Sequence, residues 1–337
     1  MTDEGTTSDF VEYARVEDET GAEVVVRAAR PEDYDAVAAF TADTWADRGG
    51  SDYIPDIYHD WIADDDGETR QTLVADLGDA PSEDLGGIVQ VTTLSAWEAW
   101  AQGMRVNPDY RGRGLAKTLS EATFDFAREA GATVLRNMVF SWNVKSLGLT
   151  RKAGYDPGIE FRWVHPRPDA DAGVDTDPAA DVPVRTGEDA DPDAAWAFWS
   201  DCAVRSELAG LALDSEESWA VSSLTRDRLR EAAGEGGLLV VGGGPTRGFA
   251  VRGRSYDREN EDGESETWVE YAVGAWARGD EDAAEALLAA IGRDAAGVGA
   301  DRTRVLIPEG VEWVTDAARA RVDVAEQPTF VMDADLT

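Results

Sequence analysis

One short segment of this chain has the residue types that suit the binding of a pyrophosphate. It runs from Val106 to Ala116, follows an apolar stretch, and contains Gly112 and Gly114 just before an amphipathic pattern that begins at Leu115. Glycine lets the backbone approach an anion closely, and the first N–H groups of a helix carry the positive end of its dipole. The segment therefore predicts a phosphate-binding turn at the N-terminus of a helix.

A second polar motif follows further along the chain. It begins with Asn143-x-x-Ser146, and the short helix predicted there ends at Gly154, which precedes Tyr155. Together the two segments resemble the GNAT superfamily of N-acetyltransferases. The motifs of that family are Arg/Gln-x-x-Gly-x-Gly/Ala and Asn-x-x-Ala/Ser followed by Gly-Phe/Tyr, and Arg111-x-x-Gly114-x-Ala116 matches the first. The resemblance covers about residues 23–166.

The resemblance implies that the chain uses acetyl-CoA to acetylate a primary amine, on a small molecule or a protein, by direct attack in a ternary complex. The implied cofactor-binding residues lie at a strand end, in the turn and in the second motif: Met104, Val106, Arg111, Gly112, Arg113, Gly114, Leu115, Ala116, Asn143 and Ser146. In this family, backbone groups at positions matching Met104 and Val106 bind pantetheine and polarise the thioester carbonyl. Asn143 and Ser146 have an alternative role as helix caps.

The catalytic acid and base are less well defined by the sequence. Glu98 is the one acid in a mostly apolar predicted strand and is a candidate general base; the alternative is an exposed edge carboxylate, with water accepting the proton. The tyrosine that commonly serves as general acid in the family is replaced by Thr150, whose hydroxyl is a poor proton donor. The alternatives are that Tyr155 or Tyr110 protonates the thiolate, or that the thiolate leaves without a general acid.

The charge of the chain is strongly negative, with 68 acidic and 31 basic residues and a formal net charge of −37. Such a surface is typical of proteins that work in concentrated salt, which predicts a halophilic source, and it disfavours nucleic-acid binding. All three lysines, Lys117, Lys145 and Lys152, lie within the two motif helices. A polyanionic ligand such as coenzyme A explains this local positive charge, and solvated helix faces are the alternative.

The predicted elements that position these residues form a mixed α/β sheet flanked by helices. We predict an acidic flexible lead-in at residues 1–20, a GNAT domain at 21–166, a linker at 167–181 and a second, degenerate GNAT-like copy at 182–337. The second copy repeats the apolar pattern of the first. Where its phosphate-binding turn should stand it has Arg278-Gly279-Asp280-Glu281-Asp282, which is too acidic to bind a pyrophosphate. A single active site is therefore expected.

Other classes of function receive less support. The single cysteine, the absence of a secretion signal and the lack of a long apolar run predict a cytoplasmic protein without membrane contact, and no metal site is expected. A homodimer is possible. The alternative function is an acyl-CoA-binding regulatory or assembly module with little catalytic activity, and a tandem layout is also found in enzymes such as mycothiol synthase.

Overall fold

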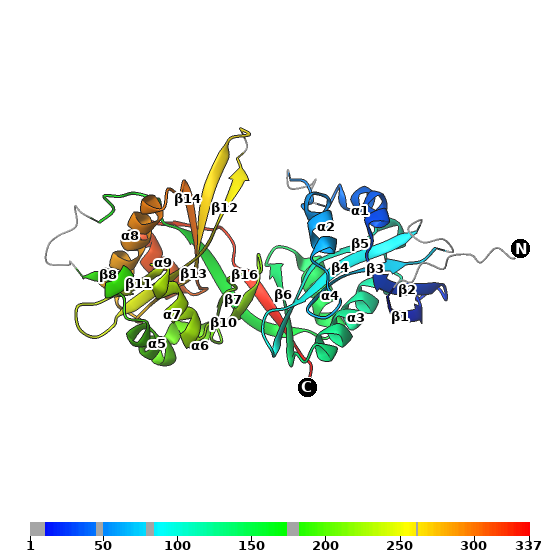
Figure 1. Ribbon diagram of the computed structural model, residues 1–337, viewed down its shortest axis with the longest axis horizontal. Coiled ribbons are helices and arrows are strands. Elements are labelled where there is room, and N and C mark those ends of the chain that lie inside the picture. Colours follow the sequence, from blue (N-terminus) through cyan, green and yellow to red (C-terminus); the bar gives the residue numbers. More distant parts are fainter. Residues whose placement is uncertain (1–10, 45–49, 79–83, 174–181, 261) are drawn as a thin grey trace, which may run out of the picture. The chain divides into compact units, whose positions relative to one another are not determined.

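The computed structural model describes residues 11–44, 50–78, 84–173, 182–260 and 262–337 (Figure 1). The chain divides into two compact units. Unit 1 comprises Met1–Asn137, Val144–Asp156 and Met332–Thr337, and unit 2 comprises Met138–Asn143 and Pro157–Val331. Both units place helices against a sheet, so the predicted mixed α/β fold is confirmed.

Unit 1 contains a sheet with the strand order β1-β2-β3-β4-β5-β6, in which only β5 and β6 are parallel. Its elements are β1 (Glu12–Glu17), β2 (Glu23–Ala28), η1 (Pro31–Asp33), α1 (Tyr34–Thr41), α2 (Ile54–Ala63), β3 (Arg70–Asp76), β4 (Leu85–Thr93), β5 (Glu98–Val106), η3 (Pro108–Tyr110), α3 (Leu115–Glu129), β6 (Val134–Phe140) and α4 (Val144–Ala153). A parallel pair needs a crossover connection, and α3 supplies it between β5 and β6.

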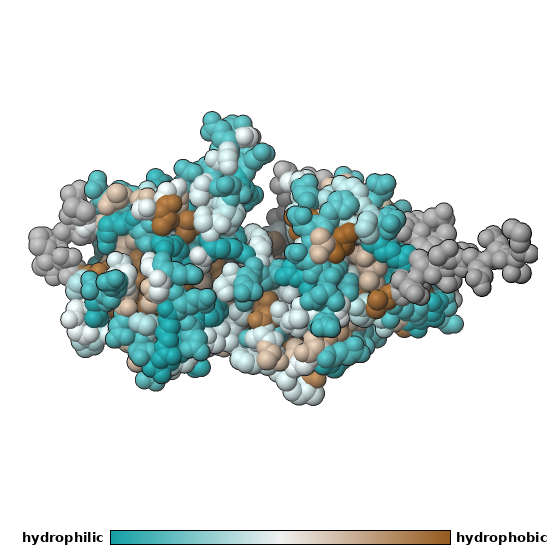
Figure 2. All heavy atoms as spheres, in the orientation of Figure 1, coloured by the Kyte–Doolittle hydropathy of each residue, from teal (hydrophilic) through white to brown (hydrophobic). Residues whose placement is uncertain are grey.

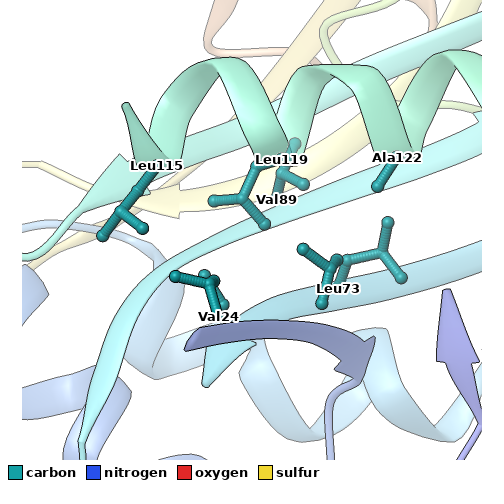
Figure 3. Close-up of a cluster of buried hydrophobic side chains, with 8 residues drawn as sticks. Val24, Leu73, Val89, Leu115, Leu119 and Ala122 are labelled. Carbon is teal, nitrogen blue, oxygen red and sulfur yellow. The ribbon is translucent and has the colours of Figure 1, made fainter. Parts of the chain in front are cut away.

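The core of unit 1 fixes the position of α3 on the sheet. Leu115 and Leu119 on one face of the helix point toward Val24, Leu73 and Val89 on the strands beneath (Figure 3). The helix lies close to the sheet because β4 carries glycine here. A Cβ atom at Gly87 would lie 2.6 Å from the Arg105 carbonyl oxygen and 2.9 Å from Leu119 Cδ1. The start of α3 is thereby held at the end of β5.

Unit 2 has a similar order of elements, with a strand, helices, three antiparallel strands, a helix, a parallel strand and a helix, but it lacks a counterpart of β1 and has two short strands and a further helix before the three antiparallel strands. Its sheet order is β7-β14-β13-β12-β11-β8. The bounds are β7 (Asp156–His165), β8 (Val184–Thr186), η5 (Gly187–Asp189), α5 (Pro192–Asp201), α6 (Ala203–Glu207), β9 (Leu211–Leu213), β10 (Val221–Ser223), α7 (Arg226–Gly234), β11 (Leu238–Val241), β12 (Gly248–Glu259), β13 (Ser265–Trp276), α8 (Glu281–Gly297), β14 (Arg302–Pro308), α9 (Val311–Arg319) and β15 (Asp323–Val324). The last strand, β16 (Thr329–Asp335), begins in unit 2 and ends in unit 1.

The compact units differ from the domain limits expected at 21–166 and 182–337. β7 was expected to close the first domain, yet it pairs with β14 and lies in unit 2 apart from its first residue. Met332–Thr337, expected in the second domain, belongs to unit 1, where the Leu336 N–H donates to the Thr133 carbonyl at 3.0 Å. Backbone pairing between residues far apart in sequence therefore decides which strand belongs to which unit.

Two segments expected to be loose are partly ordered. Glu12–Glu17 forms β1 and pairs with β2, so the prediction of a flexible lead-in is wrong for these residues; residues 1–10 lie outside the described part of the chain. In the expected linker, the Asp169 N–H donates to the Gly292 carbonyl on α8 at 3.0 Å. Residues 174–181 lie outside the described residues.

Hydrophilic residues cover most of the face of each unit that is visible in Figure 2. This agrees with the composition, because 29% of the residues are charged. Within the described ranges, none of the helices combines the length and the apolar character needed to cross a membrane.

Candidate functional site

The predicted phosphate-binding turn connects β5 to α3 in unit 1. Asn107 holds its start, since Oδ1 accepts from the Asp109 N–H at 3.1 Å and Nδ2 donates to the Leu85 carbonyl at 2.9 Å. Gly112 and Gly114 have φ angles of 78° and 82°, in the left-handed region that favours glycine. The glycines are thus required by the backbone path of the turn.

Among the described residues, no side-chain hydrogen bond from the N-cap position caps the N-terminus of α3. Gly114 is the N-cap residue, and the first turn of the helix contains no acidic residue. The Gly114 carbonyl accepts from the N–H groups of Lys117 and Thr118, at 2.9 and 3.2 Å. The earlier N–H groups, on Leu115 and Ala116, stand at the positive end of the helix dipole, where an anion is stabilised.

Basic side chains surround this turn. Arg111 is exposed, and the Arg113 guanidinium lies 4.9 Å from the centroid of the Tyr110 ring. Arg113 Nη1 also lies 3.5 Å from Asp18 Oδ2, in the turn between β1 and β2. The Tyr110 hydroxyl donates to Asp84 Oδ1 at 2.7 Å, and this contact raises the pKa of the phenol. Tyr110 is therefore a weaker proton donor than an ordinary tyrosine.

The end of β5 contains a bulge next to the turn. The register with β4 shifts between the Ile88–Arg105 and Gln90–Gln102 pairs, so that Gly103 and Met104 together face a single residue of β4. A Cβ atom at Gly103 would lie 2.3 Å from Trp61 Cη2, and its φ angle is 67°. A bulge interrupts the ladder of backbone hydrogen bonds. Met104 in this bulge is half-buried, and its carbonyl accepts from Arg105 Nη1 at 3.1 Å.

The second motif helix packs beside α3. α4 contacts α3 within unit 1, and the ring of Tyr155 lies 5.1 Å from that of Phe124 on α3. The Asn143 N–H donates to the Phe140 carbonyl at 2.8 Å, just before α4 begins, and both Asn143 and Ser146 are half-buried. The division between the compact units falls directly after Asn143, so only Ser146 belongs to the same unit as the turn.

The two candidates for a general acid in this region are both buried. Tyr155 is 2% exposed and Thr150 is 7% exposed. Burial raises the pKa of Tyr155, which makes its phenol less acidic rather than more. The Thr150 carbonyl accepts from the Tyr155 N–H at 3.2 Å, so these residues close the end of α4. Their contacts are those of core residues.

Glu98, the candidate general base, lies at the far end of β5 from the turn. The strand has nine residues, which corresponds to about 26 Å between Glu98 and Val106 in an extended conformation. The Glu98 side chain is buried and accepts from Arg136 Nη1 at 2.8 Å and from Ser95 Oγ at 3.1 Å. The structure therefore does not bring Glu98 to the turn, and its carboxylate neutralises a neighbouring arginine.

Sequence reasoning missed the residues that the β1–β2 turn brings to the site. Asp18 pairs with Arg113, and the Glu19 N–H donates to the Arg113 carbonyl at 3.2 Å. The acidic composition of the first 20 residues favoured a loose segment. The signal that could have identified the hairpin is Thr20-Gly21 between the apolar residues of two short strand-like runs.

Comparison with known proteins agrees with this geometry. Residues 35–155 match the model of the Acetyltransferase (GNAT) family, and this range includes the turn, α3 and α4. Thialysine N-epsilon-acetyltransferase from Bos taurus is 28% identical over 113 residues, which cover 31% of this chain and 66% of that protein, just under two thirds of its length.

Two solved structures share the fold. A GCN5-related N-acetyltransferase from Sphaerobacter thermophilus has 16% identity and a TM-score of 0.60, covering 93% of this chain and 96% of that chain. The glucosamine N-acetyltransferase region of a fungal multi-domain β-N-acetylglucosaminidase has 14% identity and a TM-score of 0.59, covering 93% of this chain and 38% of that chain. Residues 35–155 are thus similar to the GNAT family, and the two solved structures show the same fold.

Proposed function

We propose that this protein is an acetyl-CoA-dependent N-acetyltransferase that acts on a primary amine by direct attack in a ternary complex, with its active site in unit 1. The observation that carries the proposal is the uncapped N-terminus of α3. It follows a turn whose left-handed glycines and two arginines suit a pyrophosphate. Acetyl-CoA supplies the acetyl group as a thioester.

Each part of the site has a proposed role. The backbone N–H groups from Gly112 to Ala116 bind the pyrophosphate, and Arg111 and Arg113 add positive charge. Backbone groups of Met104 and Val106, beside the β5 bulge, orient the pantetheine arm and polarise the thioester carbonyl. Ser146, in the same unit, is proposed to donate or accept hydrogen bonds to the same arm. We propose that water accepts the proton of the amine, because Glu98 is paired with Arg136 away from the turn.

Unit 2 is proposed to be a degenerate copy of the same domain without its own cofactor site. At the start of α8, Asp280 Oδ1 accepts from the Ala283 N–H at 3.2 Å and the same carboxylate forms an ion pair with Arg247. Glu281 and Asp282 stand in the first turn of this helix. The position that an anion would occupy on α3 is thus filled on α8 by the chain's own carboxylate. One active site follows, in a protein suited to a salt-rich cytoplasm.

The test is a thiol-release assay in molar KCl with acetyl-CoA and a panel of amines that includes thialysine. Wild type is compared with Gly114→Glu and with Gly279→Glu as the matched control, since Gly279 stands in the turn before α8 and has a φ angle of 74°. We expect the first substitution to abolish turnover and the second to preserve it, with circular dichroism confirming that both variants fold. Equal loss in both variants would refute the assignment to unit 1.

A regulatory acyl-CoA-binding module is the second candidate function. It is favoured by the burial of Thr150 and Tyr155, which leaves the usual region for a general acid without an accessible phenol. Tight binding of coenzyme A by wild type, lost in Gly114→Glu, together with no thiol release for any amine, would establish this function instead.

A further inference from the structure

The β1–β2 turn places an acidic side chain beside the phosphate-binding turn. A Cβ atom at Gly114 would lie 3.4 Å from Glu19 Cγ and 3.5 Å from Glu19 Oε1. The Glu19 backbone N–H also donates to the Arg113 carbonyl at 3.2 Å. The main-chain hydrogen bond therefore holds Glu19 beside the N-terminus of α3, and its side chain lies near Gly114.

The neighbouring Asp18 ties the hairpin to the same turn through its second carboxylate oxygen. Asp18 Oδ1 accepts from the N–H groups of Thr20 and Ala22, at 2.7 and 3.0 Å, and so shapes the hairpin. Asp18 Oδ2 lies 3.5 Å from Arg113 Nη1. Arg113 is thus engaged by a carboxylate of the protein at the place where a phosphate would need it.

The Glu19 side chain itself is exposed, and among the described residues it has no hydrogen bond or ion pair. It also makes no capping hydrogen bond to α3. This contrasts with Asp280 on α8, which is bonded both to the helix and to Arg247. The carboxylate near α3 is therefore displaceable, whereas the one on α8 is fixed in place.

We infer that Glu19 and Asp18 compete with the phosphates of the coenzyme for the α3 N-terminus and for Arg113, and so set the coenzyme affinity and its salt dependence. This inference rests on the proposed function. A pyrophosphate that binds at Gly114 meets the negative charge of Glu19 at short range, and it must draw Arg113 away from Asp18. Salt screens the repulsion between Glu19 and the pyrophosphate, because the Debye length falls to about 3 Å at 1 M salt.

The inference is tested by calorimetric titration of coenzyme A into wild type and three variants, in 0.5 M and 3 M KCl. Glu19→Gln removes the charge of an exposed side chain. Asp18→Asn keeps an oxygen for the hairpin and removes the acceptor for Arg113. Glu17→Gln is the matched control, since it makes the same change of charge on an exposed side chain of β1.

We expect Glu19→Gln to bind coenzyme A about threefold more tightly at 0.5 M KCl, and to match wild type at 3 M KCl. Asp18→Asn should also bind more tightly, and Glu17→Gln should be unchanged. In the thiol-release assay, Glu19→Gln should lower the KM for acetyl-CoA and leave kcat unchanged, which a purely structural role would not produce.

Opposite results have distinct meanings. Weaker binding by Glu19→Gln or Asp18→Asn would show that the hairpin supports the coenzyme and would overturn the inference, as would equal effects of Glu19→Gln and Glu17→Gln. In both cases the proposed function would survive. If wild type bound no coenzyme A at either KCl concentration, the proposed function itself would fail, and the inference with it.

Discussion

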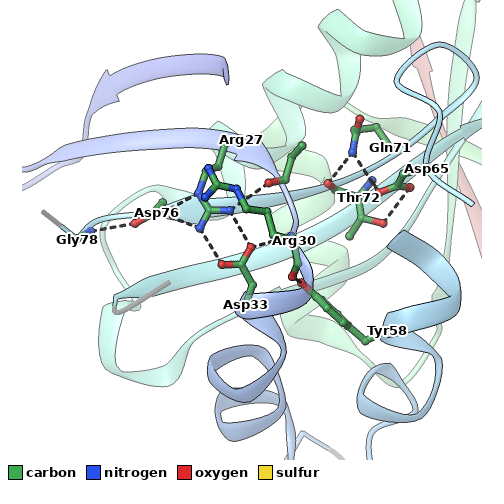
Figure 4. A network of polar contacts seen from close by, with 10 residues as sticks. Arg27, Arg30, Asp33, Tyr58, Asp65, Gln71, Thr72, Asp76 and Gly78 are labelled. Carbon is green, nitrogen blue, oxygen red and sulfur yellow. Dashed lines mark hydrogen bonds and ion pairs between the residues drawn. The ribbon is translucent and has the colours of Figure 1, made fainter. Parts of the chain in front are cut away.

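A buried ion-pair cluster around Arg27 provides a quantitative test of the unit 1 fold. The side chains of Arg27 and Asp33 are 1% and 0% exposed. Arg27 donates from Nη1 and Nη2 to Asp33 at 2.7 and 2.8 Å, and from Nε to Asp76 at 2.8 Å (Figure 4). The cluster therefore joins η1, which leads into α1, to strands β2 and β3.

We predict that Arg27→Met lowers the free energy of unfolding by about 3 to 5 kcal/mol, the usual cost of removing one partner from a buried ion pair. The loss arises because the buried carboxylates of Asp33 and Asp76 lose the arginine that pairs with both of them. A typical domain has a free energy of unfolding of about 5 to 15 kcal/mol, so unit 1 of the variant should remain folded but with a smaller free energy of unfolding. Burial limits screening, and the loss should persist between 1 and 3 M KCl.

The assay is urea unfolding in 1 M and 3 M KCl, followed by tryptophan fluorescence and circular dichroism. Arg15→Met is the matched control, because Arg15 pairs with Glu12 and Glu23 on the surface and should show no measurable change. Adding Asp33→Asn and Asp76→Asn to Arg27→Met should recover part of the loss. A stability of Arg27→Met within 1 kcal/mol of wild type would refute the reasoning.

Two further predictions concern the same unit. Leu119→Ala, which empties a fully buried site between α3 and the sheet, should cost about 3 to 5 kcal/mol in urea unfolding, and a loss below 1 kcal/mol would contradict the packing. Burial raises the pKa of Asp65 to about 6 from 3.8, so its native state binds a proton more tightly than the unfolded chain does. Stability should therefore fall as pH rises from about 4 to 6, by about 1 to 2 kcal/mol relative to Asp65→Asn, and identical pH profiles would exclude this effect.

The sequence predicted those elements around the candidate site that depend on local chemistry. Gly112 and Gly114 adopt left-handed angles that other residues avoid, and the apolar spacing from Leu115 to Ala122 matches one buried face of a helix. Such features can be recognised from neighbouring residues alone. The turn, α3 and the mixed sheet could therefore be expected before the structure was known.

Features that depend on distant pairing could not be predicted in this way. Glu98 is neutralised by Arg136, and the two meet only because β5 and β6 are parallel in one particular register. The acidic residues before Thr20 favour a loose segment by composition, yet β1 is stabilised by its pairing with β2. The position of Glu19 beside Gly114 depends on that pairing as well.

The assignment of the C-terminal segment to unit 1 has a consequence for biosynthesis. Arg128 Nε donates to the Leu336 carbonyl, a residue made 208 positions later, and Met332–Thr337 is part of unit 1. During translation, unit 1 cannot complete its fold until this segment has been made, and by then almost all of unit 2 has been synthesised. In that interval the edge of β6 next to β16 has no partner, and an unpaired edge invites aggregation between nascent chains. The dense negative charge of the chain opposes such encounters, so it protects the polypeptide before folding is complete.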